Sequence, residues 1–151
     1  MQLGSGSLAS LARLRDFTRR RVSSWDRTGA NRDFVLVREQ RRFDLVIDDI
    51  FVGRGRNVRK PPWLPDPVLA LAARRVATGG VLVSNSIDEA SAVRRALHAL
   101  YGGAIELRVR DYDNRIFAAS TRALDPRALR AAIAADPTLA ATLAKLRVRA
   151  V

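Results

Sequence analysis

The sequence contains no cysteine and only one histidine, and both shortages limit its chemistry. Without cysteine there can be no disulfide, no thiolate nucleophile and no cysteine-ligated zinc. The single histidine, His98, argues against a histidine-based zinc site and against a Ser-His-Asp triad. We therefore expect a cytoplasmic protein that works without a metal ion.

Long apolar runs are missing as well. No run approaches the ~20 residues that a membrane-spanning helix needs. The first residues also lack the basic and apolar regions of a signal peptide. The chain has 151 residues, 48% of them hydrophobic, which suffices for one domain with a true core. We expect no membrane partner.

Lysine is scarce, since only Lys60 and Lys145 occur among the 27 basic residues, and the other 25 are arginine. With 15 acidic residues the net charge is +12. Such a charge favours binding to polyanions through counterion release. However, the arginines are spread along the chain, and no zinc finger, recognition helix or stacking motif accompanies them. The charge is therefore compatible with a nucleic-acid partner, but no motif supports one. We favour a compositional bias toward arginine as the explanation of the charge.

Three Asp-Pro pairs, at 66–67, 125–126 and 136–137, predict the starts of helices. Each places a capping carboxylate before a proline at the first helical position. The first pair predicts a helix over about 66–77, and the other two predict short alanine-rich helices. The apolar stripe of the last helix would be Leu139, Leu143 and Leu146. A further amphipathic helix is predicted over 89–101, ending at Gly102-Gly103.

Short apolar segments predict the strands. Residues 43–47 and 80–83 are nearly continuous apolar runs, typical of parallel strands covered on both faces. The helix over 66–77 lies between them, so 43–85 reads as a strand-helix-strand unit with a right-handed crossover. The alternating segment 104–110 and the segment 115–120 predict an antiparallel hairpin at an edge of the sheet.

The chain therefore divides into three parts. Residues 1–38 form an N-terminal extension, irregular except for a helix suggested by Leu8, Leu11 and Leu14 and a strand or helix end at 34–37. Residues 39–124 form a partial Rossmann-like α/β domain, and 125–151 form C-terminal helices.

Polar residues at the strand ends form the candidate site. In an open α/β sheet, ligands bind at the carboxyl ends of the parallel strands. Asp49, followed by Asp48, is the candidate catalytic carboxylate, which can orient an acceptor amine or take its proton. Asn85, Asp88 and Arg54 are the candidates for substrate binding. In the alternative interpretation, Asp48 and Asp49 merely end a strand and Asp88 caps a helix.

The same region resembles a known family. FDLVIDDIFVG at 43–53, a proline-rich loop and PVLALAARRVATGGVLVSN at 67–85 resemble the second half of class I S-adenosylmethionine-dependent methyltransferases. The likeness is strongest to the branch that contains the spermidine synthases and covers about 40–124. It implies a methyltransferase-type, seven-stranded sheet with an antiparallel last strand, in which 43–120 supply the fourth to seventh strands. It also implies S-adenosylmethionine or decarboxylated S-adenosylmethionine as the cofactor and a small-molecule acceptor.

Parts of the family's site have no counterpart in this sequence. The glycine motif that holds the methionine part of the cofactor has no copy, and neither has the acidic residue that binds the ribose. Ile50-Phe51-Val52 stands where spermidine synthases carry a further catalytic aspartate. The resemblance thus implies an incomplete and inactive or weakly active transferase domain, which pairs with a missing N-terminal half or forms a homo-oligomer.

The N-terminal segment resembles a different family. LASLARLRDFTRRRVSSWDRTGANRDFV at 8–35 is similar to the start of glycoside hydrolase family 172, the difructose-anhydride hydrolases, through SSWDRTG at 23–29. That family cleaves fructofuranosyl and arabinofuranosyl linkages with glutamates on β-sandwich domains. Glu39, Glu89 and Glu106 show no matching context here. Three functions therefore stay open: an S-adenosyl-dependent transferase, a non-enzymatic partner-binding module, and a glycosidase-related fragment.

Overall fold

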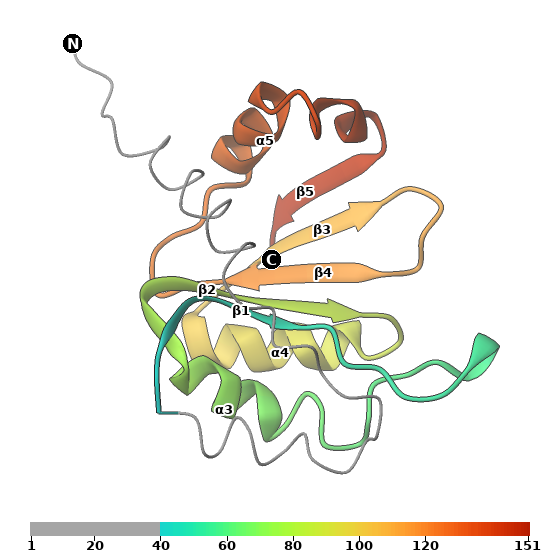
Figure 1. Ribbon diagram of the computed structural model, residues 1–151, viewed down its shortest axis with the longest axis vertical. Helices are drawn as coiled ribbons and strands as arrows, with labels where there is room; N and C mark the ends of the chain where they lie inside the picture. Colours follow the sequence, from blue (N-terminus) through green and yellow to red (C-terminus); the bar gives the residue numbers. More distant parts are fainter. Residues whose placement is uncertain (1–39) are drawn as a thin grey trace. The chain divides into compact units, whose positions relative to one another are not determined.

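The computed structural model describes residues 40–151, which belong to a single structural unit (Figure 1). The architecture is α/β, with one mixed five-stranded sheet in the order β1-β2-β4-β3-β5. The elements predicted at 8–14 and 34–37, and the segment similar to glycosidases, lie outside the described residues. The elements in chain order are β1 (Phe43–Asp48), the 3₁₀ turn η1 (Gly55–Asn57), α3 (Val68–Arg74), β2 (Val76–Ser86), α4 (Ala90–Tyr101), β3 (Ile105–Val109), β4 (Arg115–Ala119), α5 (Pro126–Ala135), the 3₁₀ turn η2 (Ala140–Ala144) and β5 (Leu146–Ala150).

The predicted strand-helix-strand unit is confirmed. Strands β1 and β2 pair in parallel, with Ile47 opposite Val83, and α3 connects them. The helix is shorter than predicted, and Asp66 does not cap it. The cap position falls on Pro67, which has no side-chain acceptor, and no side-chain hydrogen bond caps this helix.

The other two Asp-Pro pairs have different outcomes. At 125–126 the prediction is confirmed, because the Asp125 carboxylate accepts a hydrogen bond from the Arg127 N–H (2.8 Å) and Pro126 begins α5. At 136–137 the predicted helix is wrong. The Asp136 carboxylate accepts from the Thr138 N–H (2.8 Å) in a turn, η2 follows, and Leu146 begins a strand.

Strand β5 therefore replaces the end of the predicted last helix, so the last residues of the segment 125–151 belong to the sheet. It pairs antiparallel with β3, with Leu107 opposite Val148. Its sequence, Leu-Arg-Val-Arg-Ala, alternates apolar and charged residues with the period of a strand. Backbone hydrogen bonds to the otherwise open side of β3 outweigh the helical spacing of the leucines.

The hairpin of β3 and β4 is confirmed, but its predicted position at the sheet edge is wrong. Strand β4 lies between β2 and β3 and runs antiparallel to both. Strand β5 then covers the outer side of β3, so β1 and β5 are the edge strands within residues 40–151.

Helices α3 and α4 pack together along one face of the sheet (Figure 1). The core lies beneath them, and its largest buried side chains include Phe117, Leu69, Leu82, Leu97 and Val93. Helix α4 ends as predicted at Gly102, whose φ of +79° suits glycine and whose N–H donates to the His98 carbonyl (2.8 Å).

The opposite face of β1 and β2 is less covered than predicted. Leu45, Val81 and Val83 are only half-buried there, and Ile47 is 59% exposed. The apolar runs of these strands favoured cover on both faces. In residues 40–151, these four side chains of the second face retain solvent contact.

The edge position of β1 leads to a prediction about self-association. Within residues 40–151 this strand pairs with β2 alone, and an apolar edge strand is a template for pairing with another chain. We expect dimers or larger assemblies at roughly tens of micromolar, and we expect Ile47→Lys to shift them toward monomer because a charge on an edge strand opposes pairing. Light scattering measures both. Leu139→Lys, at a 46% exposed position on no strand, is the matched control, and a monomeric parent protein would contradict the prediction.

Candidate functional site

Asp48 lies at the end of β1 inside a buried network. The register places it beside Ser84 of β2, whose hydroxyl donates to Asp48 Oδ2 (2.7 Å). Lys60 Nζ lies 2.8 Å from the same oxygen, and the lysine side chain is fully buried. The charge of Asp48 is thus compensated out of contact with solvent, so this residue anchors the strand ends.

Asp49, the next residue, is exposed to solvent and held in a fixed orientation. Its Oδ1 accepts a hydrogen bond from Asn85 Nδ2 (2.9 Å), and Asn85 Oδ1 accepts from Asn114 Nδ2 (3.1 Å). The three side chains come from the ends of β1 and β2 and from the residue before β4. The structure thus brings Asp49 and Asn85 together, as the strand-end rule predicts.

The other two predicted binding residues are not brought into this group. Arg54 and Asp88 are exposed, and within the described residues neither side chain has a hydrogen bond to Asp49 or Asn85. The reading of Asp88 as a helix cap is wrong, because the residue at the N-cap of α4 is Glu89, and no side-chain hydrogen bond caps this helix.

Lys60 is a site residue that the sequence interpretation missed, and Glu89 is its backbone partner at the strand ends. The loop after β1 doubles back through paired backbone hydrogen bonds between Val52 and Arg59 (2.8 and 3.0 Å) and returns Lys60 to the strand ends. There the Lys60 N–H donates to Glu89 Oε1 (2.8 Å), and its ammonium lies 4.8 Å from the centroid of the Phe51 ring. Lys60 therefore fixes the base of the loop through its contacts with Asp48 and Glu89.

Two polar atoms beside this network are buried without a hydrogen-bond partner among residues 40–151. They are the hydroxyl of Ser86, at the end of β2, and Glu89 Oε2, at the start of α4. Buried polar groups are normally satisfied, so each of these two atoms retains the capacity for a further hydrogen bond. The described residues contain no group of three or more acidic or histidine side chains that could hold a metal ion.

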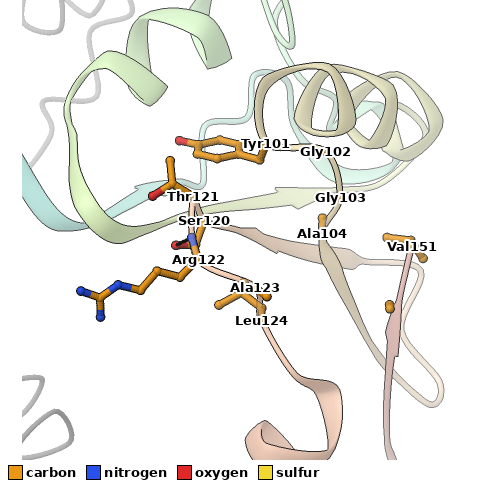
Figure 2. Close-up of a pocket in the computed structure, with 11 residues that line it drawn as sticks. Tyr101, Gly102, Gly103, Ala104, Ser120, Thr121, Arg122, Ala123, Leu124 and Val151 are labelled. Carbon is orange, nitrogen blue, oxygen red and sulfur yellow. Dashed lines mark hydrogen bonds between the residues drawn. The ribbon is translucent and has the colours of Figure 1, made fainter. Parts of the chain in front are cut away.

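A cavity of about 630 Å³ lies at the opposite end of the sheet (Figure 2). Residues from the end of α4, the segment after β4 and the end of β5 line it, and it includes none of the predicted site residues. Burial raises the pKa of the Tyr101 phenol on its wall, whose hydroxyl has no hydrogen-bond partner in the described part of the chain. Ligands of open α/β sheets bind at the carboxyl ends of the parallel strands, whereas this cavity lies at the amino ends of β2 and β3. The sequence-based rule therefore did not predict it.

Comparisons with known proteins give no match: no protein family, no curated protein and no solved structure is detectably similar to this chain. In residues 40–151, none of the helices combines the length and the apolar character that crossing a membrane requires.

The buried ion pair leads to a prediction about stability. Lys60→Met retains much of the side-chain volume but leaves the Asp48 carboxylate buried without its partner, so we expect the free energy of unfolding to fall by about 3–5 kcal/mol. Denaturant unfolding measures the loss. Lys145→Met changes the only other lysine, which is exposed, and should leave stability within about 0.5 kcal/mol. Equal stability of the two variants would show that the pair does not hold the strand ends.

Proposed function

We propose that residues 40–124 form the acceptor-binding half of an S-adenosyl-dependent transferase. The observation that carries the proposal is the exposed Asp49 carboxylate, held by Asn85 at the carboxyl ends of two adjacent parallel strands. This edge of an open α/β sheet is the usual place for a ligand.

The strand arrangement supports the same proposal. Strands β1 and β2 are parallel and joined by a helix, and β4 runs antiparallel to its neighbours. The resemblance of 40–124 to class I methyltransferases implies these features for the second half of the family sheet, including the antiparallel last strand.

The chemistry proposed for the site is transfer of a carbon group to an amine. An S-adenosyl donor supplies an electrophilic carbon on its sulfonium, so that a nitrogen–carbon bond forms while the carbon–sulfur bond breaks and a neutral thioether leaves. Asp49 accepts the proton that the nitrogen loses, and Asn85 keeps the carboxylate turned toward the acceptor. Asp48, Ser84 and Lys60 fix the two strand ends at the spacing that this geometry needs.

The sequence indicates that this half binds the donor weakly. The glycine motif and the ribose-binding acid of the family have no copy here, so we expect S-adenosylmethionine and decarboxylated S-adenosylmethionine to bind no tighter than about millimolar, or ~4 kcal/mol. Calorimetric titration with both compounds tests this. A micromolar dissociation constant for either would overturn the view that the donor half is missing.

A substitution at Asp49 tests the acceptor site directly. Asp49→Asn removes the charge and keeps the shape, so we expect any transfer rate to fall by ~10²–10⁴-fold. Where transfer is too slow to measure, binding of a diamine such as putrescine should weaken by roughly tenfold, since a hydrogen bond to a charged group is removed. Asp113→Asn, on the β3–β4 turn, is the matched control. Unchanged rate and unchanged diamine binding would show that Asp49 is only a strand terminus.

A partner-binding module is the second candidate. The outer edge of β1, which pairs with no other strand of residues 40–151, and the exposed Ile47 favour it. The glycosidase reading has less support in residues 40–151. Glu106 is buried and bonded to Arg149, and Glu89 accepts from the Lys60 backbone. Turnover of an aryl arabinofuranoside would be the observation in its favour.

A further inference from the structure

Three arginines lie side by side across the outer strands of the sheet. The register places Arg108 of β3 directly opposite Arg115 of β4 on one side and Arg147 of β5 on the other. Directly opposite residues point to the same face, and neighbouring strands are ~4.8 Å apart. The three guanidinium groups therefore form a row, which we call the arginine row.

Only Arg115 of this row has an acidic partner within the described residues. That partner is Glu106, which is buried two residues further along β3, accepts a hydrogen bond from Arg149 Nε (2.6 Å) and lies 3.6 Å from Arg115. No acidic side chain of residues 40–151 forms an ion pair with Arg108 or Arg147, and both are exposed. Like charges directly opposite each other destabilise a sheet, so a bound anion would relieve the repulsion.

An exposed aromatic side chain lies next to the row. Tyr112, on the turn between β3 and β4, is 66% exposed. Aromatic rings on a basic surface serve as stacking platforms for the bases of single-stranded nucleic acids. Asp111 and Asp113 are the neighbours of Tyr112 in the sequence and are exposed. Their charge disfavours a phosphate near the ring, so a base is the part of a nucleic acid that would contact it.

We propose that the arginine row binds the phosphate backbone of a single-stranded nucleic acid and that Tyr112 stacks on one of its bases. Guanidinium groups suit phosphates because they donate two parallel hydrogen bonds to one group. The three arginines lie on three neighbouring strands and are therefore evenly spaced, which suits the repeating phosphates of a nucleic acid. At its inner end the row reaches β2, where the register places Ser86 directly opposite Arg115. The proposal goes beyond the transferase and does not depend on it.

The experiment measures binding of the full-length protein to fluorescent 20-residue oligomers of uridylate and thymidylate by anisotropy, at 50 to 200 mM salt. We expect binding without sequence preference and with strong salt dependence. Arg108→Ala/Arg147→Ala should lower the slope of log affinity against log salt by ~1.4, because each phosphate that is no longer neutralised removes about 0.7 from the slope. Tyr112→Ala should weaken binding by roughly tenfold with little change in the salt slope.

A matched control separates the row from the overall charge. Arg74→Ala/Arg127→Ala removes the same charge from exposed positions on α3 and α5 and should retain most of the affinity. The melting temperature of Arg108→Ala/Arg147→Ala shows whether weaker binding reflects a loss of folding. We expect it to be equal to or higher than that of the parent protein, because the substitutions remove like charges that lie opposite each other.

The result decides between the proposal and its competitors. Equal weakening of oligomer binding by both double variants would overturn the proposal in favour of non-specific attraction. The absence of binding to either oligomer at 50 mM salt would also overturn it. Vesicles with 30% phosphatidylserine are the further arm. Vesicle binding that depends on the row, together with weak oligomer binding, would assign the surface to a membrane and overturn the proposal. A preference for the uridylate or the thymidylate oligomer would support it and identify the nucleic acid as RNA or DNA.

Discussion

The buried contact between Lys60, Asp48 and Ser84 holds together the part of the fold on which the candidate site depends. Asp48 Oδ2 receives both the lysine ammonium (2.8 Å) and the serine hydroxyl (2.7 Å), and these groups come from a loop and from two different strands. A buried carboxylate requires such partners because desolvation strongly disfavours its charge. The contact fixes the ends of β1 and β2, closes the loop between them, and leaves Asp49 and Asn85 at the adjacent surface.

The sequence predicted the elements whose signals are local. The apolar runs of β1 and β2, the stop at Gly102 and the turn before β4 were enough for the strand-helix-strand unit, helix α4 and the hairpin. It failed for β5, because leucines at 139, 143 and 146 fit a helix and the alternation of 146–150 fits a strand. The strand forms because β3 has a side that no other strand of the described residues pairs with, and this depends on the arrangement of the whole sheet.

The neighbouring positions of Asp49 and Asn85 could be predicted from the sequence, but the contacts of the candidate residues could not. Asp48 and Asp49 are equivalent in the linear sequence, yet the pleat separates them, since Asp48 shares the covered face with Val46 whereas Asp49 follows the end of the strand. Lys60 carried no signal, because the network that it joins connects Asp48 with Ser84, 36 residues further along the chain. The strand-end rule found Asn85, but the hydrogen bond from Asn114 requires the register of β4.

The pairing of β5 with β3 affects the order in which the chain folds. Glu106 and Arg149 bond across β3 and β5 although 43 residues separate them, whereas the β3–β4 hairpin closes within a short turn. Closing a long loop costs entropy before its contacts form, so the hairpin can assemble first and β5 last. Until β5 arrives, Glu106 has only Arg115 for a counter-charge. Docking of the last strand is therefore an electrostatic step, and it should slow as added salt screens the attraction between Arg149 and Glu106.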